Sequence, residues 1–139
     1  INTITKSMGA ADFLLGVCES WMTPALFLSV AFIAGSVISF FTGSSWGTFA
    51  ICIPIAVPMA YSFTGGQLGT LVYAAVGAVV SGGLFGDHCS PVSDTTVLSS
   101  LGAACDHIDH VRTQLPYALL AAAVSIILWI VVALVGGAV

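Results

Sequence analysis

The densest group of polar side chains is the stretch GDHCSPVSDTTVLSS at residues 86–100, which interrupts an otherwise apolar sequence. It carries two carboxylates, Asp87 and Asp94, the imidazole of His88 and a series of hydroxyl groups. Carboxylate, hydroxyl and carbonyl oxygens are the ligands that hard cations prefer. A carboxylate in such a set holds either a proton or a metal ion, so this composition predicts competition between a small cation and protons.

We expect the ion or proton to bind within this stretch, with sodium at Asp87 or Asp94. The neighbouring side chains that could complete the site are His88, Ser90, Ser93, Thr95 and Thr96. Structural alternatives exist for each type. Asp94 is suited to cap a following half-helix, and His88 to hold a structural hydrogen bond or to relay protons. Hydroxyl groups in membrane helices often bond to the backbone or to neighbouring helices. The sequence therefore does not rank the two carboxylates.

A second polar group, TGSSWGT at residues 42–48, lies between two apolar runs. Pro54 and Pro58 each remove a backbone N–H from the second run, which looks short for a full membrane crossing. Residues 22–61 are therefore predicted to form a re-entrant hairpin with its polar tip buried inside the protein. The tip residues that could contact an ion or substrate are Thr42, Gly43, Ser44, Ser45 and Thr48.

The composition requires a membrane environment. Of the 139 residues 58% are hydrophobic and only 6% are charged, with a mean hydropathy of +1.11. Soluble domains carry about 25% charged residues, so these few charges cannot form a water-soluble surface. Nucleic acid is excluded as a partner, because phosphate binding needs a basic patch and the only basic residues besides histidine are Lys6 and Arg112. The fold class is therefore an all-α integral membrane protein.

The third apolar run, residues 68–85, ends near three glycines, at positions 82, 83 and 86. We interpret these glycines as the point where a helix unwinds, and a Ser-Pro pair that follows blocks its immediate continuation. The prediction is a discontinuous helix broken near 86–92 and a shorter half-helix at 92–104. Irregular backbone at membrane depth is tolerated only where protein or a water-filled cavity surrounds it.

Residues 105–113, CDHIDHVRT, are predicted to form a loop at a membrane face. The final transmembrane helix is expected at 114–136, with Thr113 as its N-cap and Pro116 in its first turn. The loop's cysteine, acids and histidines could bind zinc, form local salt bridges in water or sense pH, and we expect no transition metal there. Residues 7–20 could form a short interfacial helix or the end of an upstream helix.

Three segments together resemble the C-terminal part of the NhaC family of sodium/proton antiporters. They are TGSSWGT with the double-proline run after it, SGGLFGDHCSPVSDTTVLSS, and CDHIDHVRTQLPYA. The resemblance covers roughly residues 22–136, and some members of the family exchange malate for lactate. It implies a longer protein built from two inverted repeats. Residues 1–139 would then be a single incomplete membrane domain and most of the second repeat.

The resemblance further implies an ion-transporter fold in which a re-entrant hairpin and a broken helix meet at the substrate site. The activity implied is secondary active exchange of sodium for protons, in the service of pH homeostasis, by a multi-pass protein of a bacterial or archaeal cytoplasmic membrane. The expected partners are membrane lipid, sodium, protons and the remaining repeat of the same polypeptide. Malate, lactate and a homodimer are left open, and no cofactor is expected.

Three rival functions are kept. An organic-acid exchanger is the nearest, although Arg112, the only arginine, lies in the predicted membrane-face loop and not in the polar stretch. A membrane-embedded metalloenzyme could use His88 with the acids and histidines of residues 105–110, but no HExxH motif is present. A structural membrane subunit is the third, for which neutralising the carboxylates Asp87 and Asp94 changes only stability.

Overall fold

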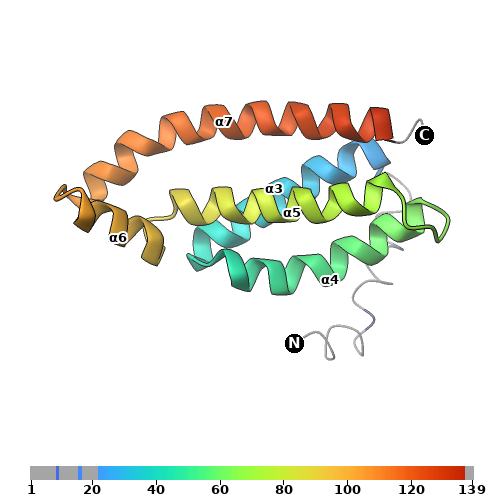
Figure 1. The fold of residues 1–139 in the computed structure, drawn as a ribbon, viewed down its shortest axis with the longest axis horizontal. Coiled ribbons are helices and arrows are strands. Elements are labelled where there is room, and N and C mark those ends of the chain that lie inside the picture. The colour runs from blue at the N-terminus through green and yellow to red at the C-terminus, as the bar shows by residue number, and fades with distance from the viewer. Residues whose placement is uncertain (1–8, 10–15, 17–21, 137–139) are drawn as a thin grey trace.

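Figure 1 shows a computed structural model of the chain, which describes residues 9, 16 and 22–136. All secondary-structure elements of the described part are helices, in line with the predicted fold class. In chain order its elements are α3 (Pro24–Thr42), α4 (Ser45–Phe63), α5 (Thr70–Cys89), α6 (Asp94–Gly102) and α7 (His107–Gly136). The interfacial helix predicted at residues 7–20 lies outside the described residues, except for two glycines.

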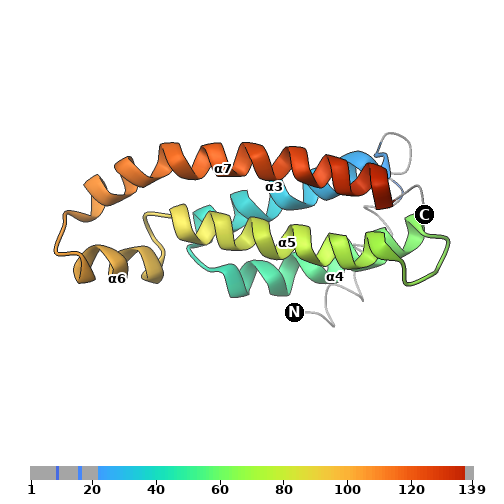
Figure 2. The same ribbon diagram turned by 45° about the horizontal axis from the view of Figure 1, so that its top comes forward.

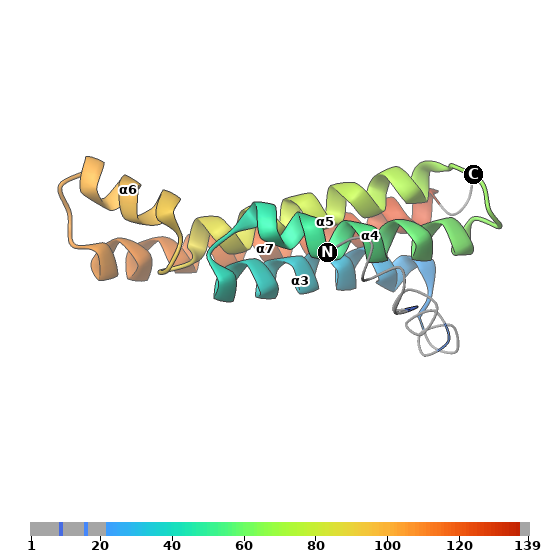
Figure 3. The ribbon, with the colours of Figure 1, turned by 90° about the horizontal axis from the view of Figure 1, so that it is seen from below.

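The helices α3, α4, α5 and α7 lie side by side, while α6 and the first turns of α7 extend beyond them at one end (Figures 1, 2 and 3). Among the described helices, α4, α5 and α7 are each long and apolar enough to cross a membrane. Their apolar side chains stay largely exposed on the outside of the bundle, with a small core around Leu28, Ala60 and Ala75. The protein is therefore a membrane protein, whose outer surface suits lipid or further helices.

Helices α3 and α5 make the most extensive contact in the bundle, and glycines allow it. A Cβ atom added at Gly82 would overlap the carbonyl oxygen of Phe32, and one at Gly86 would overlap that of Ser36. The prediction that the helix unwinds at glycines 82, 83 and 86 is therefore wrong, because all three lie within α5. Gly82 and Gly86 are small residues that bring the backbones of α3 and α5 together, whereas a Cβ added at Gly83 would overlap the Phe49 side chain of α4.

The hairpin of α3 and α4 has a shorter tip than predicted. Only Gly43 and Ser44 separate the two helices, and Gly43 adopts a left-handed φ of 65° that ends α3. Helix α4 runs 19 residues and continues through Pro54 and Pro58. The expectation that this arm is short is thus wrong, because most of the predicted polar tip joins its first turn. Membrane helices tolerate such prolines when neighbouring groups satisfy the freed carbonyls.

The second half of the chain does contain a break in its helix, as predicted, but the break lies at residues 90–93 and does not begin at residue 86. Helix α5 ends at Cys89, residues 90–93 are not helical, and α6 begins at Asp94. The short half-helix predicted at 92–104 corresponds to α6. Residues 90–93 are called the break segment below.

Helix α7 begins at His107, so the loop predicted at 105–113 is wrong for most of its length. The Oδ1 atom of Asp106 accepts hydrogen bonds from the backbone N–H groups of Ile108 at 2.9 Å and Asp109 at 3.1 Å. Asp106 therefore satisfies the first amides of the helix, which takes the place of the predicted cap at Thr113. Pro116 consequently lies in the helix interior and not in its first turn.

The hairpin tip and the break lie at the same end of the bundle. A shallow groove is lined by the end of α3 (Phe40), the end of α5 (Cys89) and residues Leu115 and Leu119 of α7. The polar first part of α7, residues 107–114, continues beyond this level for roughly 12 Å, at 1.5 Å per residue. The hairpin tip and the break therefore lie near the start of the apolar part of α7, next to the polar residues 107–114.

Candidate functional site

The break segment is fixed at its first residue by α3. Ser90 is fully buried, and its hydroxyl donates a hydrogen bond to the carbonyl oxygen of Phe40 at 2.6 Å. Phe40 lies in the last turn of α3, where carbonyl groups have no partner within the helix. The same Ser90 oxygen accepts the N–H of Val92 at 3.2 Å. The Ser90 side chain therefore satisfies a free carbonyl at the end of α3 and also fixes the backbone of the break segment.

The fourth residue of the segment connects the break to a buried carboxylate. Ser93 is fully buried and donates to Oδ1 of Asp87 at 2.7 Å, across the end of α5. The Ser93 hydroxyl hydrogen is used in this bond, so the contact of 2.8 Å with Thr95 Oγ1 has Thr95 as its donor. Ser93 also accepts the N–H of Thr95 at 3.2 Å and thereby caps α6.

The second and third residues of the segment meet two further elements. The carbonyl oxygen of Pro91 accepts a hydrogen bond from Nε2 of His107 on α7, at 2.7 Å. The backbone of Val92 packs on the hairpin tip, where a Cβ added to Gly43 would lie 2.9 Å from the Val92 carbonyl. Each of the four residues of the break segment is thus held by a different element.

The structure brings together some of the predicted site residues and separates others. The side chains of Asp87, Ser93 and Thr95 are connected by hydrogen bonds, and Ser90 joins them through its backbone. Thr96 lies beside this group and donates to the carbonyl of His88 at 3.1 Å. The side chains of Asp94 and His88 are exposed, and neither makes a hydrogen bond with the described residues. The predicted capping role of Asp94 is wrong, because Ser93 is the N-cap and Asp94 is the first helical residue.

The hydroxyl groups of the hairpin tip serve their own helices. Thr42 donates to the carbonyl of Ile38 at 2.8 Å, and Thr48 donates to that of Ser44 at 3.0 Å. The Oγ atom of Ser44 accepts the N–H of Gly47 at 3.3 Å and caps α4. Ser45 is buried in the first turn of α4. The tip therefore lies against the break segment through Gly43, and ion contacts from its hydroxyls stay a prediction.

Sequence reasoning missed Ser39 of α3. This residue is fully buried, and its Oγ has no hydrogen-bond partner in the described part of the chain. A Cβ added at Gly86 would lie 2.9 Å from the Ser39 Cβ, so Ser39 packs next to the residue that precedes Asp87. A sequence signal was available, because Gly35, Ser36 and Ser39 follow one another at helical spacing within an apolar run.

The polar sequence at residues 105–110 lies in the turn before α7 and in its first turn. Cys105 Sγ lies 3.7 Å from His110 Nδ1, on an exposed surface. Within the described residues no three such side chains are grouped closely enough to hold a metal ion. His107 points instead toward the break segment, which residue type and spacing alone did not indicate.

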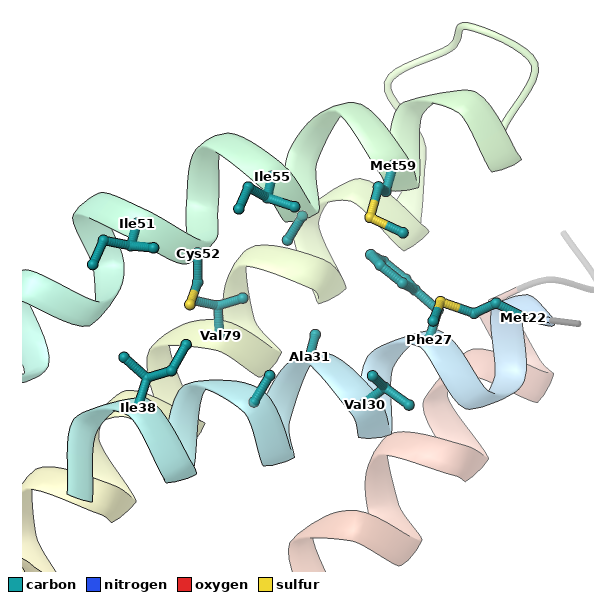
Figure 4. A pocket seen from close by; sticks show the side chains of 12 residues that line it. Met22, Phe27, Val30, Ala31, Ile38, Ile51, Cys52, Ile55, Met59 and Val79 are labelled. Atoms are coloured by element: carbon teal, nitrogen blue, oxygen red, sulfur yellow. The ribbon is translucent and has the colours of Figure 1, made fainter. Parts of the chain in front are cut away.

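A second apolar hollow lies elsewhere, between α3, α4 and α5 (Figure 4). Its cavity volume is about 280 Å³, and it is lined by Phe27, Ala31, Ile55, Met59 and other apolar side chains. It contains no charged residue and no hydroxyl group, so it cannot stabilise a desolvated ion.

Comparison with known proteins identifies the family of the chain. The sequence model of the family described as "Na+/H+ antiporter family" matches residues 1–134 of this chain. A malate-2H(+)/Na(+)-lactate antiporter of Bacillus subtilis is 37% identical over 93% of this chain and 26% of its own length. An arginine/ornithine antiporter of Halobacterium salinarum is 32% identical over 91% of the chain and 25% of its own length. The Na(+)/H(+) antiporter NhaC of Alkalihalophilus pseudofirmus is 32% identical over 89% of this chain and 26% of its own length.

The chain spans about a quarter of the length of these relatives. All three are antiporters by name, which supports a role in transport and not in enzyme catalysis. Their named cargoes differ, so similarity alone does not identify the cargo of this chain. No solved structure matches significantly.

Proposed function

The chain belongs to the Na+/H+ antiporter family, and from this premise we propose that it is part of a secondary transporter that exchanges sodium for protons. The complete polypeptide would act as a multi-pass protein of a bacterial or archaeal cytoplasmic membrane. Residues 1–139 would form most of the second of two inverted repeats, with the other repeat completing the site. The single observation that carries the proposal is the buried carboxylate of Asp87, held at the end of a broken helix.

Asp87 is the carboxylate we assign to exchange. It is 9% exposed, whereas Asp94 is exposed and makes no hydrogen bond within the described residues. Oδ1 of Asp87 accepts from Ser93, while Oδ2 has no protein donor among those residues and is free to bind a proton or a cation. Ionisable groups in membrane segments are costly and usually mark ion or proton pathways.

The helix ends around this carboxylate also favour a cation. Helices α3 and α5 both end here, at Thr42 and Cys89. The C-terminal end of a helix carries a partial negative charge and free carbonyl oxygens. When a proton binds Asp87, the site loses its negative charge and its attraction for sodium, and when sodium binds, the proton is displaced. Sodium and a proton therefore exclude each other at Asp87, and no covalent step is involved.

The position of the break is consistent with access from water. It lies near the start of the apolar part of α7, so an ion that approached Asp87 from that side would not have to cross the whole membrane. Access from the other side would require a movement of this repeat or its partner, as in alternating access. We propose that the hairpin tip is the second wall of the site and that the hairpin enters and leaves on one side.

The test uses the complete polypeptide in sealed vesicles that carry a pre-formed proton gradient. Added sodium should collapse the gradient with native protein, whereas choline should not. The Asp87→Asn variant should lose the response, because its amide still accepts a hydrogen bond from Ser93 but cannot exchange a proton. The matched Asp94→Asn variant should retain it.

Loss of exchange in Asp94→Asn with exchange intact in Asp87→Asn would contradict the assignment of the carboxylate. No response of the native protein to sodium, with or without organic acids, would contradict the function itself.

Organic-acid exchange coupled to sodium and protons is the second candidate, favoured by the malate/lactate relative at 37% identity. The N-terminus of α4 directly follows Gly43, which packs against Val92 of the break segment, and it could receive a carboxylate group. The N-terminus of α6 is less suited, since Asp94 occupies its first turn. Sodium-dependent uptake of labelled malate against internal lactate would favour this candidate over simple sodium–proton exchange.

A further inference from the structure

We propose that His107 is a positioning residue, which holds the break segment from α7 and thereby fixes the geometry around Asp87. Its effect on transport rests on the proposed function, but the contact itself can be tested without transport. Nothing in the polar sequence at residues 105–110 indicated this role, since that sequence favoured a solvated loop or a metal ligand.

Both ring nitrogens of His107 are occupied. Nε2 lies 2.7 Å from the carbonyl oxygen of Pro91. A carbonyl oxygen can only accept, so Nε2 carries a hydrogen in both the neutral and the charged imidazole. This bond therefore persists in either protonation state. Pro91 lies between two helices, so its carbonyl is not part of a helical series of hydrogen bonds. Among the described residues, the bond from His107 holds this carbonyl in place.

The second nitrogen connects the same ring to α6. Nδ1 lies 3.1 Å from the hydroxyl oxygen of Ser100, which is buried and also lies 2.8 Å from the carbonyl of Thr96. Thr96 in turn donates to the carbonyl of His88 at the end of α5. The imidazole thus joins α7 to the break segment directly and contacts the Ser100 hydroxyl of α6, and α6 is joined to the end of α5 by the Thr96 hydroxyl.

The remaining contacts of the break segment explain why this bond matters. Ser90 is held by α3, Val92 packs on the hairpin tip, and Ser93 bonds to Asp87. The hydrogen bond from α7 to the break segment comes from His107. Pro91 is only two residues from Ser93. A shift of Pro91 therefore changes the distance and angle at which Ser93 holds the carboxylate.

The test compares two substitutions of nearly equal length in the complete polypeptide. His107→Gln keeps an N–H donor at a reach close to that of Nε2, whereas His107→Met fills similar space without a donor. The matched control is His110→Met, because His110 lies one turn further along α7 and contacts Cys105 but not the break segment. The first readout is the sodium concentration for half-maximal exchange, separated from the maximal rate.

We expect His107→Met to raise the half-maximal sodium concentration about tenfold, the effect of losing one to two net hydrogen bonds on site geometry. His107→Gln should restore most of it, and His110→Met should be close to native. Equal behaviour of the Gln and Met variants would overturn the proposal, because a purely steric role does not distinguish them.

The second readout is hydrogen exchange of the backbone amides at residues 90–97 in detergent, which does not depend on transport. His107→Met should speed exchange in this segment several-fold, and His107→Gln should not. If the native protein fails to exchange sodium but this difference is found, the proposed function fails and the positioning role stands. If sodium exchange is native-like in all variants and the amides are unchanged, the positioning role fails and the proposed function stands.

Discussion

The break segment at residues 90–93 and the hairpin tip at residues 42–48 are both short, hydroxyl-rich interruptions of apolar sequence, but their hydrogen bonds run in different directions. In the tip, Thr42, Ser44 and Thr48 bond within their own helices. In the break, Ser90 and Ser93 bond to other elements or across the break. The tip can therefore form from local sequence, whereas the break acquires its shape only when α3, α5 and α7 are assembled.

This difference bears on function. A self-contained tip can move as a unit, while a segment held by several elements changes shape when any of them moves. Asp87 depends on the break segment through Ser93, so a displacement of α3 or α7 reaches the carboxylate. We infer that the break, and not the tip, is where movement of the bundle alters ion binding. Paired substitutions in the two regions test this inference.

The largest expected effect is at the point where the two regions touch. Gly43→Ala strains a left-handed φ of 65° and places a methyl group 2.9 Å from the Val92 backbone. The strain costs about 1–2 kcal/mol and the overlap about 1–3 kcal/mol more. Gly65 has the same φ of 65° but nothing within 4 Å of an added Cβ, so Gly65→Ala should be destabilised by the backbone strain alone. Thermal unfolding of the complete polypeptide in detergent should rank Gly43→Ala well below Gly65→Ala. Equal melting temperatures would show that the tip does not press on the break.

The two N-cap serines give the next comparison. Ser44 and Ser93 each accept one helix amide, at 3.3 Å and 3.2 Å, so loss of either cap costs about 1 kcal/mol. Ser93 also donates to Asp87, and a hydrogen bond to a charged group contributes about 1.5–3 kcal/mol more. Ser93→Ala should therefore lower the melting temperature more than Ser44→Ala and should weaken sodium-driven exchange. If Ser44→Ala is the more damaging of the two, the tip and not the break controls the site.

Two fully buried hydroxyls give a smaller contrast. Ser90→Ala leaves the carbonyl of Phe40 and the N–H of Val92 without their described partner, at a cost of about 1–3 kcal/mol. Thr48→Val removes a bond to the Ser44 carbonyl, which still accepts the Thr48 N–H at 3.3 Å, so the cost should stay below about 1 kcal/mol. The measurement is again the melting temperature in detergent. Similar losses from both would mean that Ser90 contributes by burial alone.

The same contrast explains which parts of the fold could be predicted from sequence. The position of the break and of α6 followed from local features, a Ser-Pro pair and a shift to polar composition. The role of glycines 82, 83 and 86 did not, because a glycine that unwinds a helix and one that admits a neighbouring backbone look alike in sequence. For Gly82 and Gly86 the overlap with the carbonyls of Phe32 and Ser36 on α3 distinguishes them, and for Gly83 it is the contact with the Phe49 side chain of α4.

The candidate site was likewise only partly predictable. A cluster of acids and hydroxyls marked residues 86–100, but it gave Asp87 and Asp94 equal weight. The two carboxylates can be ranked only once it is known that α5 continues past Asp87 and that Ser93, not Asp94, caps α6. His107 was predicted in a loop, because Thr113 and Pro116 resemble a helix start. The stronger start is Asp106, and it orients the His107 side chain toward Pro91.

The smallest expected effect is at Thr42, an exposed residue of the tip. Its hydroxyl donates to the carbonyl of Ile38 one turn earlier in α3, so Thr42→Val should change the free energy of unfolding by less than about 0.5 kcal/mol. Sodium-driven exchange should also be unchanged if the tip hydroxyls serve only their own helices. A higher sodium requirement with an unchanged melting temperature would instead make Thr42 a contact of the transported ion. That result would break the distinction between the two regions, since the tip would then bind cargo directly while the break binds it through Asp87.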